Sequence, residues 1–202
     1  MTLDDLRSKS LALTEPLAAL AERAGATPNM ISLLSMIFAL AAGVFYYLSA
    51  GGVSLLYLAA LMVLLNAVFD AVDGALARRT GTVEPRGDFL DHVIDRYADM
   101  AILVGIVLAG YVSEVWGIFA VMGVLLTSYL GTQAQALRLG RLYGGIMGRA
   151  DRLTLILGAT IANALFPGYV AGLSILGWAV ILITVASHVT ALQRIVLIWN
   201  RL

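Results

Sequence analysis

The chain has 202 residues, of which 60% are hydrophobic and 13% are charged, and its formal net charge is zero. In a soluble domain about a quarter of the residues are charged, so this composition predicts an integral membrane protein. We expect no nucleic acid among its partners. Because the chain has no cysteine, disulfide bonds, thiolate nucleophiles and zinc–thiolate sites are excluded.

Residues 1–25 form a charged segment that also contains leucines, at Leu3, Leu6, Leu13, Leu17 and Leu20. This pattern predicts an amphipathic helix that lies along the membrane surface. The segment has no short apolar core and no small-residue cleavage site, so we expect no signal peptide. A Gly-Ala-Thr-Pro-Asn turn at residues 25–29 then leads into the first apolar segment.

Six apolar segments follow, each close to the ~20 residues that a membrane-spanning helix requires. They cover residues 30–49, 53–77, 88–111, 115–138, 152–166 and 172–196. The predicted fold is therefore an all-α integral membrane protein with six transmembrane helices preceded by an amphipathic surface helix. Since no linker or soluble insertion separates the segments, we expect a single domain over residues 1–202.

Arginine and lysine are distributed unevenly among the loops. They precede the first span, follow the second and fourth spans and close the chain, whereas the loops near residues 50–52, 111–115 and 167–171 contain none. Cytoplasmic loops of membrane proteins carry the excess of Lys and Arg. We therefore expect a multi-pass protein of the cell membrane with both termini in the cytoplasm.

Four aspartates lie at the expected cytoplasmic ends of the second and third spans. Asp70 and Asp73 are three residues apart, and Asp91 and Asp95 are four apart, so each pair shares one face of a helix. Four carboxylates close together would repel one another unless a cation lay between them. Oxygen ligands without His or Cys favour Mg²⁺, Mn²⁺ or Ca²⁺ over zinc.

Small residues and an arginine accompany the aspartates. Gly74, Ala77 and Gly87 leave space for a ligand or for close helix packing, and the Arg78 guanidinium suits phosphate oxygens. The simpler interpretation is a solvated acidic helix end. Ionisable groups at a membrane are costly and usually functional, so we prefer phosphoryl chemistry on a lipid at the cytoplasmic interface.

The spacing D-x2-D-G-x2-A-R-x8-G-x3-D-x3-D resembles the signature of the CDP-alcohol phosphotransferase family. Each fixed position is matched, by Asp70, Asp73, Gly74, Ala77, Arg78, Gly87, Asp91 and Asp95. The six-span layout and the Thr27-Pro28-Asn29 entry to the first span also resemble that family, so the resemblance covers essentially the whole chain.

The resemblance implies that a CDP-linked lipid, CDP-diacylglycerol or CDP-archaeol, donates its phosphatidyl-type group to the hydroxyl of a small acceptor and that CMP leaves. It further implies that Asp70, Asp73, Asp91 and Asp95 hold two Mg²⁺ or Mn²⁺ ions and that Asp95 is the general base. The implied contacts to the CDP-lipid are Pro28, Asn29, Ser32, Gly74, Ala77, Arg78 and Gly87. The family also favours a homodimer.

The acceptor is predicted from three arginines, Arg149, Arg152 and Arg194. They resemble the phosphate-binding arginines of family members whose acceptor is itself phosphorylated, which favours inositol 1-phosphate, with glycerol 3-phosphate next and serine less favoured. One departure is Gly131, where inositol-phosphate users carry a basic residue three positions after the serine that matches Ser128. The alternative is that these arginines only set the topology or meet anionic lipid headgroups.

Two other classes remain open from the residues alone. Membrane prenyltransferases also hold Mg²⁺ on a diphosphate, but they have more spans and lack the D-G-x2-A-R element. A divalent-cation transporter would use the carboxylates as its site, but transport sites usually lie near the midplane on broken, repeated helices. The one-sided position of these aspartates counts against transport.

Overall fold

The computed structural model describes residues 14–140, 142 and 144–202, so most of the predicted surface helix, residues 1–13, lies outside the described residues. A helix over residues 14–23 comes first. The remaining elements are α2 (Pro28–Leu48), the short 3-10 helix η1 (Ser49–Gly51), α3 (Leu55–Thr80), α4 (Pro85–Leu108), α5 (Glu114–Ala136), α6 (Arg149–Leu165), β1 (Tyr169–Val170), β2 (Leu173–Ser174) and α7 (Ile175–Trp199).

A helix is present at each of the six predicted apolar segments, and long apolar runs explain the positions of α2, α3, α5 and α7. The two strands were not predicted: they pair antiparallel, with Tyr169 opposite Ser174, and form a hairpin before α7. The two residues of its turn, Ala171 and Gly172, both have positive φ angles, 48° and 82°. Alanine rarely adopts this conformation, so the sequence contained no signal for the hairpin.

Four helical segments of the described chain are long and apolar enough to cross a membrane, namely Pro28–Gly51, Leu55–Thr80, Glu114–Ala136 and Ile175–Trp199. They are consistent with a membrane protein. The helices α4 and α6 are not among the four: α4 carries the aspartates in its first half, and α6 has only 17 residues with two arginines in its first turn.

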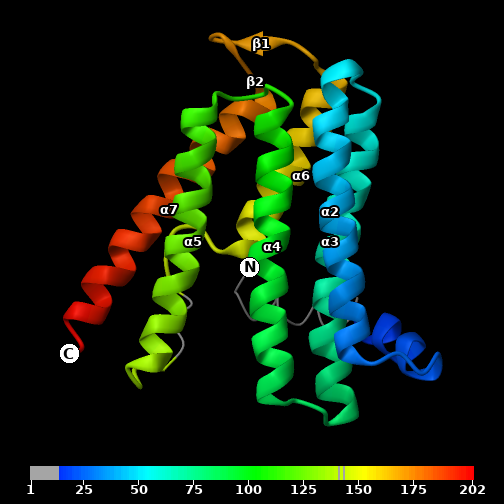
Figure 1. Cartoon of the computed structure of the whole chain (residues 1–202), viewed down its shortest axis with the longest axis vertical. Helices are drawn as coiled ribbons and strands as arrows, with labels where there is room; N and C mark the ends of the chain where they lie inside the picture. Colours follow the sequence, from blue (N-terminus) through cyan, green and yellow to red (C-terminus); the bar gives the residue numbers. More distant parts are fainter. Residues whose placement is uncertain (1–13, 141, 143) are drawn as a thin grey trace, which may run out of the picture.

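The helices form one bundle, with α2, α3 and α4 on one side and α5 and α7 on the other, as Figure 1 shows. The helix α6 packs against both α3 and α7. Close packing of α2 on α4 depends on glycine, because a Cβ at Gly105 would lie 2.2 Å from the carbonyl oxygen of Gly43. This contact determines how near α4 approaches α2.

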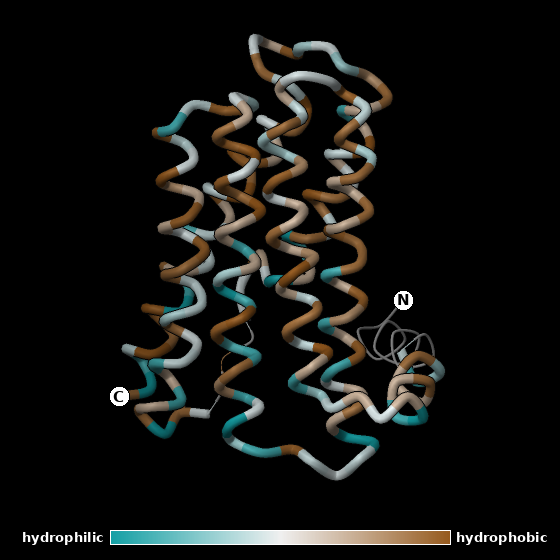
Figure 2. Tube along the Cα trace, turned by 45° about the vertical axis from the view of Figure 1, so that its right-hand side comes forward, coloured by the Kyte–Doolittle hydropathy of each residue, from teal (hydrophilic) through white to brown (hydrophobic). Residues whose placement is uncertain are grey.

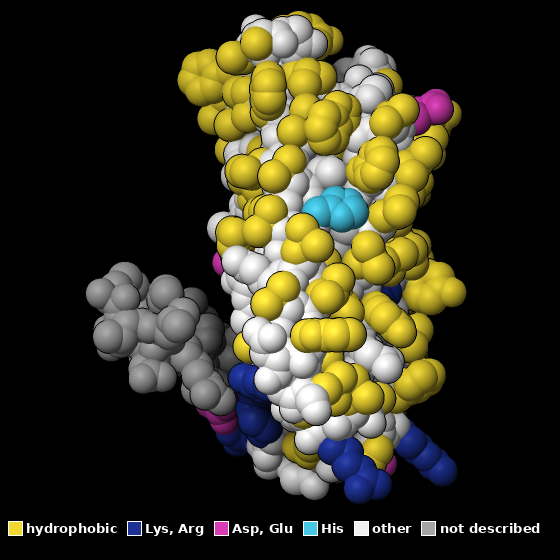
Figure 3. Space-filling view, turned by 90° about the vertical axis from the view of Figure 1, so that its left-hand side faces the viewer, with side chains coloured by type: hydrophobic (Ala, Val, Ile, Leu, Met, Phe, Trp, Pro, Cys, Tyr) yellow, Lys and Arg dark blue, Asp and Glu magenta, His cyan; other side chains and the backbone are white. Residues whose placement is uncertain are grey.

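Polar residues gather at the lower end of the bundle, where α3 connects to α4 (Figure 2). On the face drawn in Figure 3, hydrophobic side chains cover the surface from the top downward and the Lys and Arg side chains gather toward the lower end. The charge asymmetry predicted from the loops is therefore an asymmetry between the two ends of the molecule.

The helix at residues 14–23 is attached to this charged end. Ala18 is fully buried and packs in a cluster with Ile31 of α2 and Leu76 of α3. Arg79 of α3 forms ion pairs with Glu15 and Glu22, at 2.7 and 2.5 Å. These contacts hold the segment beside the start of α2.

Candidate active site

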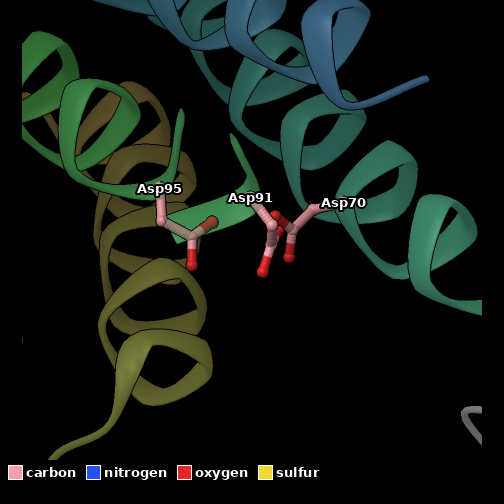
Figure 4. A group of neighbouring side chains, drawn as sticks. All are labelled: Asp70, Asp91 and Asp95. Carbon is pink, nitrogen blue, oxygen red and sulfur yellow. The ribbon is translucent and has the colours of Figure 1, made fainter. Parts of the chain in front are cut away.

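Three of the four predicted aspartates meet at the lower end of the bundle. Asp70 on α3 and Asp91 and Asp95 on α4 each offer a carboxylate oxygen, and these three oxygens lie within 4.8 Å of one another. Figure 4 shows the three side chains converging from the two helices. The i, i+4 spacing on α4 places Asp91 and Asp95 on the side that faces α3.

The fourth aspartate, Asp73, lies outside this group and points toward α2. Its Oδ2 accepts a hydrogen bond of 2.5 Å from Ser32 Oγ, and the residue is only 6% exposed. Ser32 stands in the second turn of α2, which begins at Pro28 behind a Thr27 cap whose Oγ1 accepts from the Met30 amide. Asp73 therefore links the start of α2 to α3.

A cavity of about 590 Å³, the larger cavity, opens beside the aspartates. All seven residues predicted to contact a CDP-lipid line it, and so do the four aspartates. The segment Thr27–Asn29 and the α3–α4 connection both line it. The likeness at the entry to the first span thus corresponds to a real wall of this cavity.

Arg78 is the basic side chain of the larger cavity. A Cβ at Gly74 would lie 3.3 Å from Arg78 Nη1, so glycine leaves room for the guanidinium beside the helix. Within the described part of the chain, the Arg78 guanidinium makes no hydrogen bond or ion pair. Its donors are available for an anion.

A second basic group occupies the aspartate cluster itself. Arg149, at the start of α6, places Nη1 2.7 Å from Asp70 Oδ2 and 3.1 Å from Asp95 Oδ1, and its Nε lies 3.6 Å from Asp99 Oδ1. The sequence predicted Arg149 as a ligand of an acceptor phosphate and contained no indication of these carboxylate contacts. The guanidinium neutralises part of the repulsion among the aspartates.

The three predicted arginines line a second cavity of about 160 Å³, the smaller cavity, between α4, α5, α6 and α7. Arg152 is 5% exposed and donates to Asp99 Oδ2 at 2.5 Å. Arg194 donates to the carbonyl oxygens of Gly144 and Thr127, at 3.0 and 2.5 Å. Arg194 therefore also ties α7 to α5 and to the loop before α6.

Gly131 has a steric role next to Arg194. A Cβ at residue 131 would lie 3.0 Å from Arg194 Nη1, which is tighter than ordinary contact. The glycine that departs from the family pattern thus lies where the Arg194 guanidinium needs the space.

Sequence reasoning missed several residues of the smaller cavity. Asp99, Thr127, Ser128 and Thr132 line it and are not among the predicted site residues, although Asp99 continues the i, i+4 spacing of Asp91 and Asp95. That spacing was the one available signal. Thr127 contributes a backbone carbonyl, which side-chain patterns do not report.

Asp95 is the one predicted catalytic residue, and it lines both cavities. A molecule in the larger cavity and a molecule in the smaller cavity would both contact this carboxylate. The arrangement suits a reaction between two substrates that enter from different sides of one carboxylate.

The site fits a hard divalent cation. The Asp70 Oδ1 and Asp95 Oδ1 atoms are buried and make no hydrogen bond, although Asp95 Oδ1 lies 3.1 Å from Arg149. Buried carboxylate oxygens without donors are costly, and an ion bound by oxygen ligands satisfies them.

Comparison with known proteins identifies the chemistry. Residues 26–190 match the CDP-alcohol phosphatidyltransferase family. The chain belongs to this family. As a CDP-alcohol phosphatidyltransferase it is an enzyme, and neither the prenyltransferase nor the transporter interpretation is retained.

Curated relatives match along most of their length. The archaetidylinositol phosphate synthase of Pyrococcus horikoshii is 34% identical over 171 residues, which are 85% of this chain and 82% of that protein. The phosphatidylinositol phosphate synthase of Mycobacteroides abscessus is 35% identical over 190 residues, covering 90% and 81% of the two chains.

Solved structures match the transferase as well. The phosphatidylinositol phosphate synthase of Mycobacterium tuberculosis in complex with manganese and citrate has a TM-score of 0.78 at 27% identity, covering 93% of this chain and 89% of that chain. The same enzyme with CDP-DAG bound has a TM-score of 0.77 at 26% identity, covering 94% of each chain.

Proposed function

We propose that this transferase moves the phosphatidyl-type group of CDP-diacylglycerol or CDP-archaeol to a hydroxyl of inositol 1-phosphate and releases CMP. The observation that carries the proposal is the position of Asp95, which lines both the larger and the smaller cavity. The relatives named above form archaetidylinositol phosphate and phosphatidylinositol phosphate. Inositol phosphate is the part that their products share.

The larger cavity binds the CDP-linked lipid. Pro28, Asn29 and Ser32 contact the nucleotide from α2, while Gly74, Ala77 and Gly87 provide the space into which it fits. Arg78, whose donors have no partner within the described residues, binds the diphosphate oxygens. The neighbouring structure with CDP-DAG bound supports this assignment.

The smaller cavity binds the acceptor phosphate through Arg149, Arg152 and Arg194. Phosphate held by guanidinium groups places the acceptor hydroxyl beside Asp95. Asp95 then takes the proton of that hydroxyl. The acceptor oxygen forms a bond to the phosphorus that carries the lipid, and the bond from that phosphorus to CMP breaks.

Asp70, Asp91 and Asp95, together with Asp73, would hold two Mg²⁺ or Mn²⁺ ions. Asp73 Oδ2 also accepts the hydrogen bond from Ser32. When bound, these ions neutralise the diphosphate and stabilise the charge on the departing CMP. The manganese complex of the neighbouring structure supports a divalent cation here.

The enzyme is a single domain of the cell membrane, with six spans, a surface helix at residues 1–25 and both termini in the cytoplasm, and it forms a homodimer. The lengths of α4 and α6, 24 and 17 residues, lie within the range of membrane spans, although neither helix is apolar throughout. Their charged groups pair with each other, as Arg152 does with Asp99. Because the chain has no cysteine, single introduced cysteines can report the orientation of each loop, and crosslinking can report the dimer.

The test of the reaction is CMP release by purified protein with Mn²⁺ and a CDP-lipid, with inositol 1-phosphate, glycerol 3-phosphate and serine offered in parallel. We expect release with inositol 1-phosphate and little with the others. Release with glycerol 3-phosphate or serine alone would reject the acceptor and keep the reaction. CDP-lipid binding without release for any of the three would reject all of them as acceptors.

A further inference from the structure

Asp99 lies one helical turn beyond Asp95 on α4, and its two oxygens serve two different arginines. Its Oδ2 accepts from Arg152 at 2.5 Å, and its Oδ1 lies 3.6 Å from Arg149 Nε. Asp99 is 7% exposed and Arg152 is 5% exposed. An arginine and a carboxylate as buried as these are stable only when they are paired.

The two arginines stand where a helix alone does not favour them. Arg149 and Arg152 both belong to the first turn of α6, the end of the helix that carries partial positive charge. Asp151 compensates in part by accepting from the Gly148 amide at 2.8 Å. Asp99 supplies the other negative charge, from a different helix.

Three donors of these guanidinium groups remain without a hydrogen bond, although they are buried: Arg149 Nε, Arg149 Nη2 and Arg152 Nε. Both residues line the smaller cavity. Buried donors without acceptors are costly, and an anion in the cavity would satisfy them. Asp99 thus faces Arg149 Nε and accepts from Arg152 Nη2, and it leaves Arg149 Nη2 and Arg152 Nε for an anion.

Asp99 also differs from the other carboxylates that contact Arg149. Asp70 and Asp95 belong to the group that fits a divalent cation, and oxygens that bind a cation are no longer available to Arg149. Within the described chain, Arg149 contacts three carboxylates, and Asp99 is the one that lies outside the metal-binding group. It can therefore retain Arg149 when the metal is present.

We propose that Asp99 is a positioning residue that holds Arg149 and Arg152 at the smaller cavity, so that both bind the acceptor phosphate while the aspartate cluster binds metal. The inference rests on the proposed function, since it assigns the anion of that cavity. The proposal predicts that removing the Asp99 charge weakens anion binding. Charge alone predicts the opposite, because removing a negative charge beside two arginines would tighten the binding of an anion.

The test measures binding of sulfate, a doubly charged anion that does not precipitate with Mn²⁺, to the Mn²⁺-loaded protein by calorimetry. In Asp99→Asn we expect sulfate affinity to fall about tenfold, the effect of losing one hydrogen bond to a charged group, with Mn²⁺ affinity unchanged. In turnover assays the KM for inositol 1-phosphate rises and the KM for the CDP-lipid does not. Glu114→Gln, an exposed carboxylate in the first turn of α5 that lines neither cavity, is the matched control.

Sulfate affinity that is unchanged or tighter in Asp99→Asn overturns the proposal. If that variant does not fold, two others are compared: Arg152→Gln, in which Asp99 still faces Arg149, and the double variant Asp99→Asn with Arg152→Gln, which removes the buried pair. We then expect weaker sulfate binding by the double variant than by Arg152→Gln, because Arg149 loses its support. Equal binding by these two variants would overturn the proposal.

A failure of the proposed function would be seen in a different measurement, the acceptor preference of the unaltered enzyme in the CMP-release assay. The sulfate measurement does not depend on which phosphorylated acceptor that enzyme uses.

Discussion

Replacing Arg149 by alanine should tighten divalent-cation binding while it weakens acceptor binding. Arg149 Nη1 lies 2.7 Å from Asp70 Oδ2 and 3.1 Å from Asp95 Oδ1, and a cation bound by these two carboxylates competes with the guanidinium for both of them. The variant removes this competition. Most single substitutions at a ligand-binding site weaken every ligand, so the opposite signs make the prediction specific.

The magnitude follows from the two displaced contacts. A hydrogen bond to a charged group contributes about 1.5–3 kcal/mol net when buried, and the side chains of Arg149, Asp70 and Asp95 are 16%, 26% and 19% exposed. Part of the free energy lost when the cation displaces Arg149 is recovered, because Arg149 retains its contact with Asp99. A net change of about 1.5–3 kcal/mol corresponds to a Kd for Mn²⁺ that is roughly ten- to a hundredfold lower.

The assay is titration of the purified protein with Mn²⁺, in the absence of nucleotide, with free Mn²⁺ followed by electron paramagnetic resonance. Arg86→Ala is the control, because Arg86 is an exposed arginine in the first turn of α4 and its removal changes the net charge equally. Mn²⁺ affinity that is unchanged in Arg149→Ala, or that rises equally in both variants, would refute competition by Arg149.

Three further substitutions test the site and its support. Asp70→Ala should abolish metal-dependent binding of CDP, measured by calorimetry, and retained affinity would remove Asp70 from the metal site. Arg78→Ala should raise the KM of the CDP-lipid about tenfold, as expected for one lost charged hydrogen bond, without changing the acceptor KM; equal changes in both would reject a contact to the diphosphate. Gly105→Ala should lower the melting temperature and weaken Mn²⁺ binding, since its Cβ would lie 2.2 Å from the Gly43 carbonyl oxygen and would move α4; an unchanged melting temperature would contradict this close packing.

Four of the helices, α2, α3, α5 and α7, could be predicted from the sequence because each is a long apolar run. The aspartates could be assigned to shared helix faces because local spacing determines which side chains neighbour one another on a helix. Spacing did not reveal that Asp73 would turn to Ser32, since that contact depends on how α2 packs on α3.

The contacts of Arg149 could not be predicted from local spacing either. Its carboxylate partners lie on α3 and α4, whereas Arg149 begins α6. Such pairing depends on the packing of helices distant in sequence. Asp99 carried a local signal, its four-residue spacing from Asp95, but no pattern in the chain indicated that its partners would be two arginines of another helix.

The substitution Asp95→Asn tests whether Asp95 is the general base. CDP-lipid binding and acceptor-dependent CMP release should be measured on the same preparation with Mn²⁺. We predict that the variant binds the CDP-lipid with nearly unchanged affinity and releases no CMP, since an amide cannot take the acceptor proton. Retained CMP release would contradict a base at Asp95, and loss of both binding and release would show that Asp95 mainly holds the metal.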